Sequence, residues 1–206
     1  KNHKGHEFNI FKNIKEIFAF KELRSLSLLG LSTHFTIPIK NVVLPMIVIS
    51  SFDLSNTHLS IALLVMNAAL IVEFILGSVA DRVGKGKSIV LGQTVNVGGL
   101  IALFFAPNFT WLLIILLLRS FGRALWDVSA LSFMSDVAER HNVEGKAFGS
   151  YMSIGRIASS ISFLVSGFLL TFLNMGIFLV YAGLIIIALL ISGKVIWNTR
   201  TESAED

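Results

Sequence analysis

Six long apolar runs, separated by short polar breaks, occupy most of the chain between residues 25 and 197. A helix needs about 20 apolar residues to cross the hydrocarbon core of a bilayer, and each run is close to that length. Backbone polar groups in lipid must bond within their own segment, so these runs are expected to be helices rather than open strands. The expected crossings are 25–50, 59–80, 88–106, 110–134, 147–173 and 176–197. The pattern predicts an all-α integral membrane protein with six transmembrane helices.

The placement of positive charge predicts the orientation of these helices in the lipid bilayer. Lysine and arginine gather in the lead 1–24, in the second and fourth connections, and at 194–200, across the end of the sixth run. The opposite connections contain neither residue, so the positive-inside rule predicts a multi-pass cell-membrane protein with both termini cytoplasmic. We expect an amphipathic cytoplasmic lead at 1–24, a transmembrane bundle at 25–197 and a cytoplasmic tail at 198–206. The basic charge needs no nucleic-acid partner to explain it.

Several classes of chemistry are not supported by the composition. The sequence has no cysteine, which excludes disulfides and thiolate metal sites within it, and its five histidines show no ligand spacing. No serine, histidine and aspartate set lies at a common depth. We therefore expect no metal, no cofactor and no enzymatic activity.

Ionisable side chains inside the apolar runs carry the functional hypothesis. Each costs about 2.5–3.5 kcal/mol near the bilayer centre and should face protein or water. They are Lys40 in the first run, Glu73 in the second, Arg119, Arg123 and Asp127 in the fourth, and Arg156 in the fifth. We expect the first, second, fourth and fifth helices to surround something polar, with the third and sixth facing lipid or supporting the others. Because cations outnumber acids, an anionic ligand would balance the charge unless a partner supplies acids.

The three charges of the fourth run recur every four residues and therefore share one face of a helix. Arg123 and Asp127 are expected within reach of each other, which leaves Arg119 freer to contact a ligand. The alternative is that these charges form internal salt bridges that only hold the helices in register.

Prolines interrupt the first run on both sides of Lys40 and Asn41. Pro38 and Pro45 each remove a helix hydrogen bond and free a carbonyl group. A broken helix beside a charge at membrane depth is typical of substrate sites in transporters. A passive kink is the alternative.

Two further titratable groups are candidates for carrying a proton. His34 precedes the predicted break, and it could move protons or simply be hydrogen-bonded. Glu73 could take up and release a proton within the membrane. Equally, Glu73 could form a structural pair with Arg156 or Lys40.

The segment 77–87, with the sequence GSVADRVGKGK, resembles the G-x-L-A-D-R-x-G-R-K loop of the major facilitator superfamily. Val79 replaces the leucine, and Gly86 is inserted among the basic residues. The resemblance implies a cytoplasmic gate; the residues that match are Gly77, Asp81, Arg82, Gly84 and Lys85. We expect Asp81 to cap a helix N-terminus.

Two other family motifs match less completely. Leu118, Arg119 and Gly122 look like the arginine motif of the fourth helix, although the glycine comes one residue early. Gly155 and Arg156 fall where the family places a glycine–proline antiporter motif, but the proline is missing. That departure argues against drug–proton antiport.

The resemblance implies half of a twelve-helix fold, built as two inverted three-helix repeats. A second six-helix half, covalent or supplied by a dimer mate, would then complete the transporter. The lack of an initial methionine and the polar lead favour a C-terminal half, whereas the well-kept loop motif favours an N-terminal one.

The leading hypothesis is a secondary active transporter that moves a small anionic solute by alternating access, with proton coupling as an additional possibility. Its proposed substrate ligands are Lys40, Asn41, Arg119 and Arg123, and its proposed proton carriers are Glu73, Asp127 and His34. The alternatives are a proton-coupled exporter of drugs or lipophilic cations and a non-transporting membrane receptor.

Overall fold

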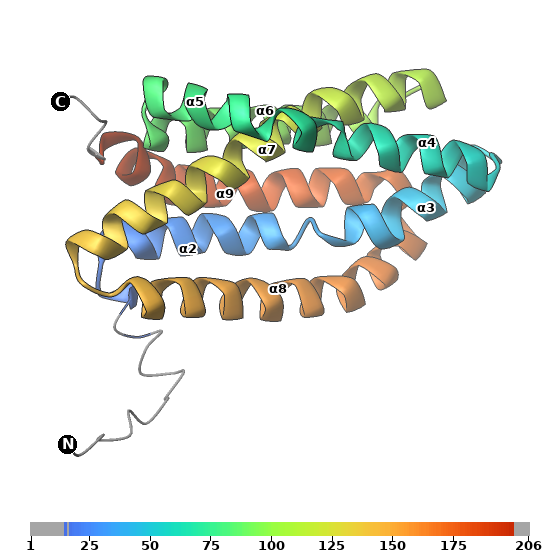
Figure 1. The fold of residues 1–206 in the computed structure, drawn as a ribbon. Helices are drawn as coiled ribbons and strands as arrows, with labels where there is room; N and C mark the ends of the chain where they lie inside the picture. The colour runs from blue at the N-terminus through green and yellow to red at the C-terminus, as the bar shows by residue number, and fades with distance from the viewer. Residues whose placement is uncertain (1–14, 16, 200–206) are drawn as a thin grey trace, which may run out of the picture.

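A computed structural model describes residues 15 and 17–199, and the described residues form helices joined by short turns without any strand (Figure 1). The expected amphipathic lead at 1–24 lies largely outside the described residues, as does most of the tail at 198–206. The chain therefore has the all-helical membrane class that its apolar runs predict.

The helical segments include α-helices and shorter π-helical or 3-10 pieces, the latter labelled η. In order they are α2 (Lys21–His34), η1 (Ile39–Val43), α3 (Leu44–Met46), η2 (Ile47–Ser51), α4 (Asn56–Asn67), η3 (Ala68–Val72), α5 (Glu73–Val83), α6 (Lys85–Phe104), α7 (Phe109–Arg140), α8 (Glu144–Leu173), η4 (Asn174–Gly176) and α9 (Ile177–Asn198). The first π-helical pieces, η1 and η2, belong to the first apolar run, and the 3-10 piece η3 belongs to the second.

Five helical stretches in the described part of the chain are long and apolar enough to cross a membrane. They are Lys21–Ser51, Asn56–Val83, Lys85–Phe104, Phe109–Arg140 and Glu144–Asn198. The last stretch contains both α8 and α9, between which the chain reverses direction at the 3-10 turn η4 (Figure 1).

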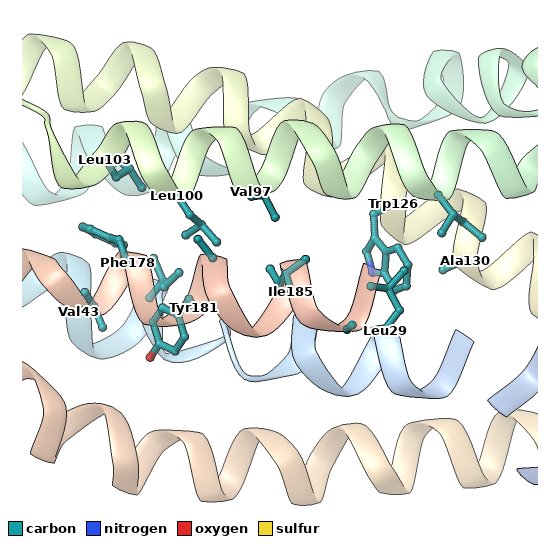
Figure 2. Close-up of a cluster of buried hydrophobic side chains, with 14 of the residues drawn as sticks. Leu29, Val43, Val97, Leu100, Leu103, Trp126, Ala130, Phe178, Tyr181 and Ile185 are labelled. Atoms are coloured by element: carbon teal, nitrogen blue, oxygen red, sulfur yellow. The ribbon is translucent and has the colours of Figure 1, made fainter. Parts of the chain in front are cut away.

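The bundle is arranged with α8 along one edge and α4 and α5 along the other (Figure 1). Between these edges, α2 packs on α8 and α9, and α6 packs on α7 and α9. Figure 2 shows Val97 and Leu100 of α6 facing Phe178 and Ile185 of α9 in a buried apolar layer. We refer to this layer between α6 and α9 as the apolar seam.

A close contact of two glycines joins α6 to α7. A Cβ atom on Gly92 would lie 2.8 Å from the carbonyl oxygen of Gly122, and the reverse distance is also 2.8 Å. Small residues allow this backbone approach between membrane helices. The early glycine of the fourth-helix motif therefore lies where the helix crossing needs it.

The first membrane stretch is broken at residues 35–37, immediately before Pro38, as its sequence predicts. Helix α2 ends at His34, and Ile37 N then donates to His34 O in a tighter turn. The second proline, Pro45, does not break the stretch, because it lies at the start of the short helix α3 where its missing N–H is tolerated.

Candidate functional site

A pocket of about 210 Å³ lies between the first, second and fourth membrane stretches. It is lined by Thr36, Ile37, Lys40, Asn41, Met66, Asn67, Leu70, Glu73, Arg119, Ser120, Arg123, Ala124 and Asp127. The structure thus brings together all the predicted substrate ligands and two of the predicted proton carriers, Glu73 and Asp127.

The helix break carries one wall of this pocket. Thr36 lies within the turn that follows α2, and Lys40 and Asn41 lie in the π-helical piece η1. Lys40 Nζ donates a hydrogen bond to Asn67 Oδ1 at 3.0 Å. That bond ties the broken first stretch to the second stretch, at the residue that precedes η3.

Asn67 is a pocket residue that the sequence analysis missed. Its side-chain amide also donates to Leu63 O, one helical turn earlier, which orients Oδ1 toward Lys40. A lone amide within the aliphatic run 59–80 was the signal that could have identified it.

The fourth stretch supplies an ion pair on the opposite wall. Arg123 Nε donates to Asp127 Oδ2 at 2.8 Å, which confirms the predicted reach between these residues. Arg123 Nη1 also lies 3.4 Å from Thr36 Oγ1, so the pair contacts the residue just beyond the helix break. The charge of Arg123 is therefore largely balanced within the chain.

Arg119 differs from Arg123 in being both deeply buried and incompletely satisfied. Its side chain lines the pocket, the residue is only 2% exposed, and its Nε has no hydrogen-bond partner among the described residues. Gly99 of α6 makes room for it, because a Cβ there would lie 2.7 Å from Arg119 Cβ. A buried donor without an acceptor is costly, and an oxyanion in the pocket would supply that acceptor.

Glu73 lines the pocket from the second stretch and is half-buried. The alternative of a structural pair with Lys40 or Arg156 is not seen, since Glu73 forms no ion pair among the described residues. Lys40 is held by Asn67 instead, and Arg156 is exposed on α8.

His34 does not line the pocket. Its ring packs against Gly155 of α8, and both ring nitrogens are buried without a hydrogen-bond partner among the described residues. The simple alternative of a hydrogen-bonded histidine is therefore not what the structure shows.

The fifth apolar run, which forms α8, contributes no residue to this pocket. The expectation that it would help surround the polar centre is wrong for the chain as described. The third and sixth runs also contribute no residue to the pocket, as expected. The third run nevertheless makes a polar contact with the first. Gln93 of α6 is fully buried and donates to Thr33 Oγ1 of α2 at 2.6 Å.

The loop motif lies away from the pocket, where α5 meets α6. Gly84 alone separates the two helices and has a φ of 99°, a conformation that glycine adopts readily. Gly84 is also the N-cap of α6, without a side-chain bond, so the predicted capping role of Asp81 is wrong. Asp81 and Arg82 are exposed, and Gly77 lies within α5 beside Val128.

Lys85 of the loop motif is anchored by a residue that the sequence analysis missed. Its Nζ contacts Asp136 Oδ2 of α7 at 2.6 Å, and both side chains are largely buried. The inserted Gly86 lies against the backbone carbonyl of Ile196, so this departure from the motif allows α6 to approach α9 closely.

Comparison with known proteins gives one family match. A family model described as the Major Facilitator Superfamily matches residues 26–206. No curated protein matches the chain.

Proposed function

The chain belongs to the major facilitator superfamily of membrane transporters, and from this premise we propose that it is a secondary active transporter of a small anionic solute. Alternating access would expose the pocket to each side of the membrane in turn. Lys40, Asn41, Arg119 and Arg123 would contact the substrate. The loop motif would form the cytoplasmic gate, with Asp81 and Arg82 exposed there and Lys85 held by Asp136.

The anionic character of the substrate rests on Arg119. Within the pocket, Arg123 is paired with Asp127, whereas the almost completely buried Arg119 has an Nε without a partner among the described residues. Charge-assisted hydrogen bonds to a carboxylate or phosphate are strong and would satisfy this donor. The pocket volume of about 210 Å³ favours a small solute.

Proton coupling is best supported at Glu73. Asp127 is held by Arg123, but Glu73 faces the pocket without an ion pair among the described residues. A carboxylate in this position can exchange a proton with the pocket as substrate binds. His34, whose two ring nitrogens have no partner in the part of the chain that the structure describes, is a second group along the first stretch that could relay the proton.

A second six-helix half would complete the site. Arg156 is exposed near the middle of α8, and a charge facing lipid at that depth costs about 2.5–3.5 kcal/mol. Only 11% of the most apolar window of Asn56–Val83 is buried, against 44% for Lys85–Phe104. A partner half bearing a carboxylate opposite Arg156 would cover that charge, and the apolar surface of Asn56–Val83 can face either lipid or the same partner half.

In this arrangement α8 and α9 are separate crossings, which gives six helices as two inverted three-helix repeats. The protein would lie in the cell membrane with both termini cytoplasmic. The positive charges of the predicted cytoplasmic connections support that orientation.

The first test is thermal stabilisation of the purified native protein by small anions, sugars and lipophilic cations at two pH values. We expect selective stabilisation by an anion, followed by its uptake into proteoliposomes. Arg119→Ala should weaken that anion's binding by about 30-fold or more, because losing a buried charged contact costs about 2–5 kcal/mol. Arg24→Ala, which removes an exposed charge at the start of α2, is the matched control.

An unchanged anion response in Arg119→Ala would refute the assignment of the substrate site. Stabilisation by lipophilic cations would instead support the exporter alternative. Ligand stabilisation without solute flux would support the receptor alternative. Proton coupling is tested separately: Glu73→Gln should abolish the pH dependence of uptake, with binding retained.

A further inference from the structure

The helix break leaves the Phe35 carbonyl without its usual backbone donors. In a regular α-helix that donor would be Ile39 N, but Ile39 N donates to Thr36 O instead. In a 3-10 turn it would be residue 38, which is a proline and has no N–H. A carbonyl group inside a membrane must find another partner.

The partner is a side chain of α8. Ser162 Oγ donates to Phe35 O at 2.5 Å, although these residues are 127 positions apart in the chain. Ser162 is 1% exposed, so the donating side chain is itself buried in the helix packing. The carbonyl group left free by the break in the first stretch is therefore satisfied by a residue of the fifth apolar run.

Ser162 is itself part of a buried polar chain that reaches α9. Ser166 Oγ, one turn along α8, donates to Ser162 O and contacts the hydroxyl of Tyr181. Tyr181 is 2% exposed. The hydrogen bonds thus link α9, α8 and the break in one series, which we call the serine clamp (Ser162, Ser166 and Tyr181).

Close packing holds α8 against α2 on the side of the break nearer the α2 N-terminus. The His34 ring occupies the space over Gly155, and the Tyr151 ring occupies the space over Gly30. A side chain on either glycine would collide with these rings. These contacts fix the end of α2, while the serine clamp fixes the first carbonyl beyond it.

The pocket begins one residue after this carbonyl. Thr36 contacts Arg123, and Lys40 contacts Asn67 across the pocket. We propose that Ser162 is a positioning residue for the pocket: by holding the Phe35 carbonyl, it sets where Thr36, Lys40 and Asn41 lie relative to the fixed α7 wall. Its importance for transport rests on the proposed function, but its effect on the geometry of the break does not.

The test uses single-cysteine reporters, which the absence of cysteine from the sequence makes practical. Asn41→Cys reports on the wall that follows the break, and Leu70→Cys reports on the wall from the second stretch. Each is labelled with N-ethylmaleimide in the full-length protein in proteoliposomes. Removing the clamp with Ser162→Ala should raise the labelling rate at Asn41→Cys about fivefold, the population change expected for one net hydrogen bond. The rate at Leu70→Cys should not change.

Two variants separate positioning from general loosening. Ser162→Thr keeps a hydroxyl and should restore the original labelling rate. Ser160→Ala removes a hydroxyl whose bond within the described residues is to Arg156 O on its own helix, and it should have no effect at either reporter. If Ser162→Ala does not fold, Tyr181→Phe should give the same pattern with a smaller change.

Equal changes at both reporters, or none at Asn41→Cys, would overturn the inference. So would failure of Ser162→Thr to restore the rate. Because labelling requires no substrate, the pattern can appear even if Arg119→Ala shows that the anion site was assigned wrongly.

Discussion

The pocket and the apolar seam are built from helices of different regularity. In the seam, α6 and α9 are continuous α-helices that bury their apolar faces against each other. The first and second membrane stretches, which form two of the pocket walls, contain π-helical and 3-10 pieces. Apolar packing stabilises the seam. The shape of the pocket depends instead on side chains that bond to backbone groups left without a helical hydrogen bond.

This difference predicts that changes in the seam lower stability, while changes at the pocket walls alter binding and leave stability nearly unchanged. Substitutions at each region can test that separation.

Phe178→Ala should have the largest effect, because Phe178 is fully buried in the seam. In a membrane protein the unfolded helices remain in lipid, so truncating Phe178 loses little free energy of transfer from water. The cavity left between α6 and α9 still costs packing energy, and we expect a loss of roughly 2–3 kcal/mol of unfolding free energy. Thermal unfolding in detergent would measure it. Phe172→Ala, at a position that is 72% exposed, is the control and should change the midpoint little.

Gly92→Ala, on the seam helix α6 but at its contact with α7, should be the next most damaging to stability, since its Cβ would meet the backbone of Gly122 and Trp126 at 2.8 Å. Backbone atoms cannot move aside as a flexible side chain can, so we expect a loss of about 1–3 kcal/mol. Gly98→Ala adds the same atom on the same helix, where nothing lies within 4 Å. Equal unfolding midpoints for the two variants would contradict the glycine contact.

Asn67→Ala should affect binding rather than stability. It removes the acceptor for Lys40 Nζ, and we expect anion affinity to fall about fivefold with little change in the unfolding midpoint. Asn56→Ala, at the exposed start of α4, should change neither quantity. A large loss of stability in Asn67→Ala would mean that the pocket walls are structural in the same way as the seam.

Thr36→Val should have the smallest effect of the set. The contact from Arg123 Nη1 to Thr36 Oγ1 is long, at 3.4 Å, and Arg123 keeps its bond to Asp127. A change of at most about threefold in anion affinity is expected. Thr36→Ser retains the hydroxyl and should match the unsubstituted protein in the same titration.

The sequence was sufficient to predict features that depend on local pattern. Apolar length predicted helices, Pro38 predicted the break, and the spacing of Arg123 and Asp127 predicted their ion pair. Charges at membrane depth predicted the five ionisable residues that line the pocket, because burial in lipid leaves such groups few other places to lie.

Features that depend on contacts between distant segments were not predictable in this way. Ser162 and Phe35 come together only because two helices pack closely, and neither residue is unusual in its own segment. Asp136 was likewise missed because its partner, Lys85, lies 51 residues away. Arg156 was assigned to the polar centre by depth alone, but depth does not determine which way a side chain points.

The 3-10 piece Ala68–Val72 has a geometric consequence for Glu73, which follows it. A 3-10 helix advances by about 120° and 2.0 Å per residue, compared with about 100° and 1.5 Å in an α-helix. Over its 5 residues, the difference amounts to a rotation of about 100° and an extension of about 2.5 Å. A helical wheel drawn through the second stretch as one α-helix would therefore place Glu73 about a quarter-turn from its actual direction. A change of these residues from 3-10 to α-helical winding would rotate the Glu73 carboxylate about the helix axis by a similar angle.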